Sequence, residues 1–234
     1  MKSHPSLSHT SPLPRSNVRR RLLAAFALLG LLLCGLATTL IAPRAAAAEP
    51  SPGQLVLDNS QRVIRTLFQR RAEFQANPEA LHSFIRSEFT TIFDRVYSAR
   101  LVLGSHSRGA SDTEVRAFAD ALAENLMQRY GNSLLQVDPG LHVKLVAQNS
   151  LRNGSIIKVM TLIDRKAGAP VPVDYLMHRN AGQWQVFDVI VEGISFVQTF
   201  RSQFDDELRS KTLAQLTNDL RAGKIQVDAS TRKQ

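Results

Sequence analysis

The sequence has almost no cysteine. Among its 234 residues the one cysteine is Cys34, which lies inside an apolar run near the N-terminus. The rest of the chain can therefore form no disulfide, carries no thiol nucleophile and offers no cysteine ligand to a metal ion. The part of the chain that follows this run must be stabilised by its hydrophobic core alone.

Motifs that mark metal sites, nucleotide sites and hydrolases are also missing. The histidines beyond residue 48 are His82, His106, His142 and His178, and no two of them stand four residues apart. The sequence contains no H-E-x-x-H and no G-x-x-x-x-G-K-[ST] pattern. The segment around Ser195 begins like G-x-S-x-G but lacks the second glycine. We therefore expect no metal ion and no cofactor.

A basic surface for nucleic acid is absent as well, although the formal net charge is +9. Residues 1–48 hold six of the 29 basic residues and no acidic residue, which leaves 23 basic and 20 acidic residues in the remainder, a net charge of +3. That remainder has no dense Lys/Arg run with interleaved aromatic residues to follow a phosphate backbone. We expect no binding of nucleic acid.

The N-terminal segment has the pattern of an export signal. Arg19, Arg20 and Arg21 precede an apolar run over residues 22–41, and Ala46-x-Ala48 then matches a cleavage site before Glu49. We predict that residues 1–48 are a signal peptide. A run of about 20 residues could also stay uncleaved as a membrane anchor, and the arginine pair leaves the twin-arginine route open. Both alternatives place the rest of the chain outside the cytoplasm.

Helical periodicity dominates the first half of the remaining chain. After a short linker over residues 49–54, apolar residues at helical spacing predict helices over residues 55–73 and 77–97. In the second of these, Asn77 is the expected N-cap and Pro78 the first helical residue. Ser111 and Glu114 form a capping-box pattern for a third helix that ends near residue 130, where Gly131 is a plausible stop.

The period then changes from 3.6 to 2. Alternating segments predict strands over residues 141–147, 156–163, 171–178 and 183–192, and Asn153-Gly154 marks a hairpin between the first two. Helical spacing returns for two helices over residues 194–208 and 213–220. Tight turns imply antiparallel pairing, so we predict an α+β fold: a curved four-stranded antiparallel sheet wrapped by helices around an apolar pocket. The domain spans residues 55–222, and residues 223–234 are a C-terminal tail.

Two carboxylates in the last predicted strand raise the possibility of catalysis. Asp188 and Glu192 are four residues apart, so on a strand they share a face at roughly 13 Å, from about 3.3 Å per residue. Glycosidase-type pairs need about 5–9.5 Å, so the two cannot act as such a pair, although either could act alone as a base. We interpret them instead as marking the outward face, or as caps. Phe187, Val189 and Val191 then face the other way.

Several segments resemble one known family. They are FDRVYSARLVLG (93–104), ASDTEVRAFADALAENLMQRYG (110–131) and VPVDYLMHRNAGQWQVFDVIVEGISFVQTFRSQF (171–204), with W-x-V-x-D-V-x-V-E-G-I-S as the most specific pattern. Together they resemble the MlaC family, also called the toluene-tolerance family, and the resemblance covers about residues 55–220. It implies an NTF2-like fold whose apolar pocket takes acyl chains.

The resemblance also implies a role. Family members are periplasmic carriers that ferry glycerophospholipids between an inner-membrane ABC transporter complex with an MCE-type ring and an outer-membrane lipoprotein–porin complex. We therefore expect a monomeric lipid carrier of the periplasm and not an enzyme. The alternative is an NTF2-like enzyme that uses Asp188 or Glu192 as a lone general base.

The expected lipid contacts combine helical and strand positions. The residues that we predict to line the pocket are Tyr97, Leu101, Phe118, Leu122, Tyr130, Val143, Val159, Val173, Tyr175, Met177, Phe187, Val189, Val191, Ile194 and Val197. The strand positions depend on strict alternation, because a shift of one residue moves every side chain to the other face. Periodicity does not distinguish a filled core from an open cavity. Since a carrier must release its lipid, we expect few headgroup contacts, with Arg or Lys at most at the rim.

Overall fold

The computed structural model describes residues 49–136, 140–165 and 168–228. The chain divides into two units, residues 1–48 and 49–234, and only the second contains described residues. The predicted signal peptide therefore lies outside them. Among the described residues, none of the helices combines the length and the apolar composition that crossing a membrane requires.

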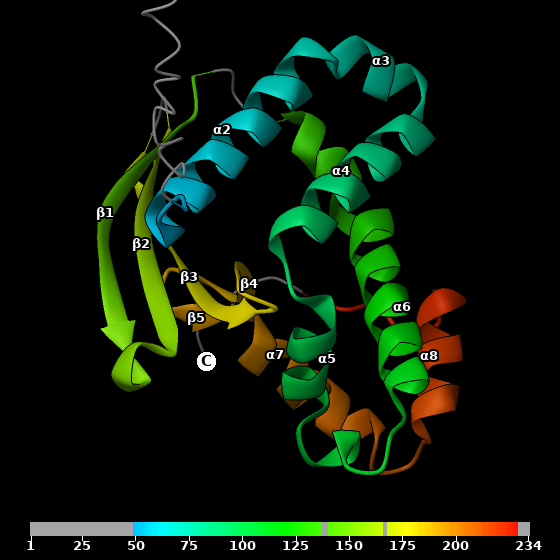
Figure 1. Ribbon diagram of the computed structural model, residues 1–234. Coiled ribbons are helices and arrows are strands. Elements are labelled where there is room, and N and C mark those ends of the chain that lie inside the picture. The colour runs from blue at the N-terminus through cyan, green and yellow to red at the C-terminus, as the bar shows by residue number, and fades with distance from the viewer. Residues whose placement is uncertain (1–48, 137–139, 166–167, 229–234) are drawn as a thin grey trace, which may run out of the picture. The chain divides into compact units, whose positions relative to one another are not determined.

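The described ranges contain helices at both ends of a central run of strands (Figure 1). The α-helices are α2 (Pro52–Gln69), α3 (Arg71–Ala76), α4 (Pro78–Ile92), α5 (Arg95–Leu103), α6 (Asp112–Tyr130), α7 (Phe196–Glu207) and α8 (Leu213–Arg221). The 3₁₀ helices are η1 (Gly104–Ser107), η2 (Gly131–Gln136) and η3 (Arg152–Gly154). The strands are β1 (His142–Leu151), β2 (Ile156–Asp164), β3 (Val171–Asn180), β4 (Gln183–Val191) and β5 (Ile194–Ser195).

The strands form one open sheet in the order β1-β2-β3-β4-β5, and every neighbouring pair is antiparallel. This confirms the α+β class and the antiparallel sheet. The sheet differs from the prediction by one strand: the two-residue β5 pairs with the end of β4. In sequence, β5 falls inside the region that helical spacing had assigned to the next helix.

Side-chain caps fix where the helices begin. The Ser111 hydroxyl accepts the backbone N–H of Glu114 at 3.2 Å, and the Glu114 carboxylate accepts the N–H of Ser111 at 2.9 Å, which confirms the capping box. Asn77 caps α4, whose first residue is Pro78, as predicted. Gly131 is not a stop, because its φ of −54° is helical and the chain continues into η2.

The helix predicted over residues 77–97 is in fact two helices. Phe93 adopts an extended conformation and forms a parallel bridge with Val186, and the N–H of Asp94 donates to the Val186 carbonyl at 2.8 Å. The Asp94 carboxylate then accepts the N–H of Tyr97 and starts α5. Pairing with the sheet therefore interrupts the helix where no glycine or proline does so.

The ends of the domain also differ from the predicted boundaries. Helix α2 begins at Pro52 with Ser51 as its N-cap, so the predicted linker over residues 49–54 is shorter, and among the described residues 49–51 precede the helix. At the other end the Asn125 amide donates to the carbonyls of Leu220 and Ile225, and Val227 is fully buried. The first part of the predicted tail therefore packs against α6.

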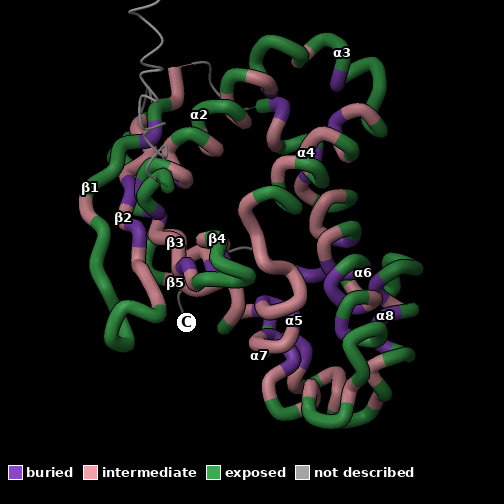
Figure 2. The backbone as a smooth tube through the Cα atoms, viewed as in Figure 1, coloured by how far each residue is buried: buried purple, intermediate pink, exposed green. Residues whose placement is uncertain are grey.

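Figure 2 marks the buried residues along the backbone in purple. Their side chains form three separate groups rather than one continuous core. The helical cluster joins α5, α6, α7 and α8: Ala99, Val102, Leu103, Val115, Phe118, Ala119, Ala121, Leu122, Phe200, Phe204, Leu216, Leu220 and Val227. The sheet cluster joins α2 to the sheet: Val56, Val159, Met177 and Val186. The α2–α4 cluster comprises Leu67, Phe74, Leu81 and Leu135.

Candidate functional site

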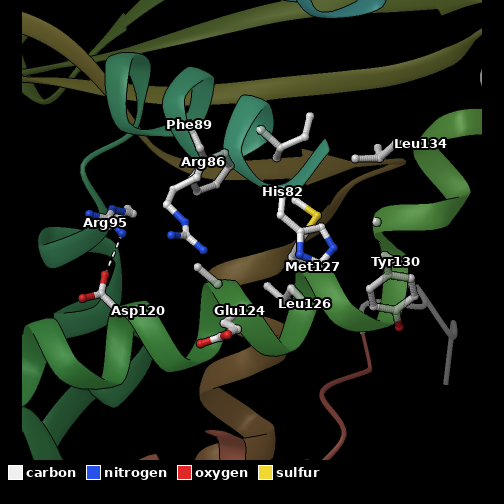
Figure 3. Close-up of a pocket in the computed structure, with 13 residues that line it drawn as sticks. His82, Arg86, Phe89, Arg95, Asp120, Glu124, Leu126, Met127, Tyr130 and Leu134 are labelled. Carbon is white, nitrogen blue, oxygen red and sulfur yellow. Dashed lines mark hydrogen bonds and ion pairs between the residues drawn. The ribbon is translucent and has the colours of Figure 1, made fainter. Parts of the chain in front are cut away.

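A cavity of about 520 Å³ lies between α4 and α6, and Arg95 of α5 and residues of η2 complete its wall (Figure 3). Its apolar lining residues are Ile85, Phe89, Ala123, Leu126, Met127 and Leu134. The volume is within the range of about 300–1,000 Å³ that small-molecule sites occupy. The cavity therefore has the size and lining of a ligand site.

Helix α4 packs in the α2–α4 cluster with one face and lines the cavity with another, because its apolar residues cover more than one face. Leu81 belongs to the α2–α4 cluster and is fully buried. His82, Ile85, Arg86 and Phe89, at spacings of three and four, line the cavity instead. Phe89 stacks on Phe93 with ring centroids 4.4 Å apart, yet it remains 41% exposed, which is high for a phenylalanine.

Helix α6 is divided in the same way. One face holds Phe118 and Leu122 in the helical cluster. The face rotated away from it presents Ala123 and Met127 to the cavity, with Asp120 and Glu124 beside them. The cavity thus lies where the helical cluster ends and the α2–α4 cluster begins.

Charged side chains surround the apolar lining. Arg95 of α5 forms an ion pair of 2.6 Å with Asp120 of α6, across one end of the cavity. Arg86 reaches from α4 toward α6, where Glu124 lies on the facing surface (Figure 3). The site therefore combines an apolar interior with a rim of two cations and two anions, which suits a ligand with an apolar body and a charged end.

The predicted strand residues share one sheet face, as the register shows. Val143, Val159, Val173, Tyr175, Met177, Val189 and Val191 all lie on it. Helix α2 covers this face through Val56, and the Tyr175 hydroxyl bonds with Ser60 of the same helix. Burial raises the pKa of the Tyr175 phenol above its usual range. These residues are brought together, but they pack against a helix.

The remaining predicted residues fall in other places. Phe118 and Leu122 are in the helical cluster with Val197 packed against it, and Leu101 and Ile194 are half-buried. Tyr97 stacks on His178 with ring centroids 4.3 Å apart and meets Phe187 edge-on at 5.2 Å. Phe187 also meets the His178 ring edge-on at 5.4 Å, so the prediction that it shares a face with Val189 and Val191 is wrong. Of the predicted set, Tyr130 lines the cavity.

Of the two roles predicted for Asp188, the solvent-facing surface is wrong and the cap is confirmed. Strands β3 and β4 pair Leu176 with Asp188 but Met177 with Val186, so Phe187 is an extra residue in a bulge. Asp188 is only 5% exposed, and its oxygens accept the Ser195 hydroxyl at 2.6 Å and the N–H of Val197 at 3.1 Å. Burial raises the pKa of this carboxyl above its usual range, although the hydrogen bonds oppose the shift. Its role is to hold the start of α7.

Glu192 does not belong to the strand at all. Strand β4 ends at Val191, and Glu192 is exposed in a turn with a φ of +51°. The two carboxylates therefore lie in different environments, and neither lines the cavity between α4 and α6.

A family model described as MlaC protein matches residues 57–222. The chain belongs to the MlaC family. Two curated relatives agree with this assignment. One is the toluene tolerance protein ttg2D of Pseudomonas putida, which is 26% identical over 71% of this chain and 77% of its own length. The other is the intermembrane phospholipid transport system binding protein MlaC of Haemophilus influenzae, which is 20% identical over 69% of this chain and 76% of its own length.

A solved structure shows the same fold. It is the phospholipid-binding protein of Ralstonia solanacearum in complex with a phospholipid, which matches with a TM-score of 0.67 at 17% identity. The match covers 76% of this chain and 99% of that chain. Membership of the MlaC family and this fold agree with the resemblance found in the sequence.

Most residues of the cavity were not predicted as a site. Ile85, Phe89 and Met127 fall inside predicted helices, but none of them was predicted to contact a ligand. A signal was present in α4, where Phe84, Ile85, Phe89 and Phe93 together span roughly half of the helix circumference at 3.6 residues per turn. That width exceeds the stripe needed for one packing interface.

Proposed function

We propose that the chain is a phospholipid carrier whose cavity between α4 and α6 receives acyl chain. The observation that supports this most directly is an apolar cavity that the protein's own side chains leave unfilled, with Arg86 and Arg95 at its rim. Membership of the MlaC family supports the same role. So do two names: that of the relative from a phospholipid transport system, and that of the solved structure in complex with a phospholipid.

To carry a lipid, a protein must shield the acyl chains from water, and it needs no catalytic residues. Each buried CH₂ contributes about 0.8 kcal/mol, so a carrier needs only to remove acyl chain from water. The proposed lone base of the enzyme alternative, Asp188, is bonded to Ser195 and Val197 and does not line the cavity. We therefore favour carriage over catalysis.

The sheet face predicted from the sequence enters the proposal as a second contact surface. Val159 and Met177 are fully buried beneath α2, next to the half-buried Tyr175 and Val189. A lipid can reach these residues only when α2 moves away from the sheet. The cavity between α4 and α6 needs no such movement.

The proposed cellular role follows the family. The protein acts in the periplasm as a monomer, receives and delivers glycerophospholipid, and docks on an inner-membrane ABC transporter complex with an MCE-type ring and on an outer-membrane lipoprotein–porin complex. The name of the Haemophilus influenzae relative, an intermembrane phospholipid transport binding protein, supports this proposal.

Lipid analysis of the purified protein tests the proposal. We expect native mass spectrometry to show a mass increase that corresponds to phospholipid, and extraction to recover that lipid. The protein should also take up lipid from vesicles of phosphatidylethanolamine and phosphatidylglycerol after delipidation. A protein that stays free of phospholipid in both experiments is not a carrier.

A further inference from the structure

The charged residues around the cavity do not all have partners. Arg95 is paired with Asp120 at 2.6 Å. Arg86 and Glu124 also line the cavity, yet neither forms an ion pair or side-chain hydrogen bond in the described part of the chain. One cation and one anion are therefore left facing the same space from opposite helices (Figure 3).

Arg86 is exposed and has no acidic partner on its own helix. Glu88, two residues along the same helix, is engaged by Arg62 of α2 at 2.7 Å. Glu79, at the start of α4, lies 3.9 Å from His82. The acidic residues of α4 are thus directed elsewhere, and the guanidinium of Arg86 points toward α6 with all its donors available.

We propose that Arg86 and Glu124 together recognise a zwitterionic headgroup, with its phosphate against Arg86 and its ammonium group against Glu124. This inference rests on the proposed carrier function and adds the headgroup class to it. A guanidinium binds phosphate oxygens through paired N–H donors, and a carboxylate favours a nearby ammonium. The acyl chains then extend along the apolar lining.

The charge balance of the rim favours this headgroup over an anionic one. Two basic and two acidic residues make the rim neutral overall, so net charge gives an anionic lipid no advantage. Phosphatidylglycerol would satisfy Arg86 but would leave Glu124 unpaired beside a phosphate. Phosphatidylethanolamine would satisfy both side chains.

A second surface next to Arg86 offers an alternative site for the headgroup. Arg86 also borders a depression of about 460 Å³ lined by Ser83, Ser87, Thr90 and Thr91. Hydroxyl groups there could bind a hydroxylated headgroup such as phosphoglycerol on the side of α4 that faces away from Glu124. In that arrangement lipid selection would depend on Arg86 but not on Glu124.

The test measures which lipid the protein selects. Delipidated full-length protein is incubated with vesicles of equal parts phosphatidylethanolamine and phosphatidylglycerol, and the bound lipids are quantified by mass spectrometry. We expect the wild type to enrich phosphatidylethanolamine. Glu124→Gln should lower the bound ratio by up to about fivefold, the effect of one exposed ion pair, and Glu124→Lys should reverse the preference. Arg86→Gln should reduce the uptake of both lipids.

Matched controls separate this inference from the carrier proposal. Arg65→Gln on α2 and Asp206→Asn on α7 remove the same charges on exposed surfaces outside the cavity, and we expect wild-type ratios for both. Circular dichroism confirms that each variant is folded. No uptake by the wild type would refute the carrier proposal. Uptake with the same ratio in wild type and Glu124→Gln, or a wild-type preference for phosphatidylglycerol, would refute headgroup recognition alone.

Discussion

Two apolar regions of this protein have similar residues and opposite states of packing. In the sheet cluster, Val159 and Met177 are completely buried under α2. In the cavity between α4 and α6, Met127 is half-buried and Phe89 is 41% exposed beside unfilled space. The comparison shows that an apolar face becomes a filled core or an open cavity according to whether a neighbouring element covers it.

The largest expected difference between the two regions is in stability. Met177→Ala should lower the free energy of unfolding by about 2–5 kcal/mol, because it leaves a void in a filled cluster. The matched Met127→Ala should cost less than about 1 kcal/mol, because the side chain already borders open space. Urea denaturation of both variants measures the difference. Equal costs would show that the cavity is as tightly packed as the sheet cluster.

The next largest effect is on lipid binding. Ala123→Trp should fill the cavity and reduce bound phospholipid about tenfold, equivalent to about 1.4 kcal/mol, with little change in stability. Ala72→Trp on the exposed surface of α3 is the matched control and should bind lipid normally. If Ala123→Trp retained its lipid, the sheet face would become the preferred binding surface.

A smaller effect concerns the end of the cavity. The ion pair between Arg95 and Asp120 joins α5 to α6 at the solvent-exposed rim. A double-mutant cycle with Arg95→Gln and Asp120→Asn should give a coupling energy of about 0.2–1 kcal/mol that decreases at high salt. A coupling energy above that range would mean that the pair is shielded from solvent and is a structural part of the cavity wall.

The smallest expected effect is the pH dependence of the stability that Asp188 contributes near the end of β4. Unfolded Asp188 ionises near pH 3.9, whereas burial raises the pKa of the folded carboxyl. Its contribution to stability is therefore full below about pH 3.9 and decreases as the pH rises through the folded pKa. The stability of the wild type minus that of Asp188→Asn should fall over this window and then stay constant. A difference that rises with pH contradicts the assignment.

The sequence predicted which helices and strands form better than it predicted where a helix is interrupted by contact with the sheet. The capping box of Ser111 and Glu114 is a local interaction, so its pattern was sufficient to locate α6. The break between α4 and α5 was missed because it depends on the pairing of Phe93 with Val186, which is distant in sequence. The family and the fold class could be recognised from extended motifs.

The candidate site was harder to predict than the fold. Strict alternation failed at the bulge around Phe187, whose ring meets Tyr97 and His178 instead of joining the face of Val189. Asp188 does lie opposite Val189 as predicted, but it is buried there and not exposed to solvent. Alternation did bring Val159, Val173, Tyr175 and Val189 together on one face. It could not show that α2 covers that face, because the position of one helix relative to a sheet is set by tertiary packing and not by the spacing of residues.

The division of the interior into three clusters has a consequence for motion. Helix α4 has a single fully buried residue, Leu81, and it borders the cavity along the side that faces α6. Helix α6, by contrast, has six buried residues. Local opening should therefore require less free energy at α4 than at α6, since fewer apolar contacts must be broken. In the proposed carrier, the cavity can then widen by a displacement of α4 alone while α6 and its partners stay folded, so the free-energy cost of widening is separate from the stability of the whole domain.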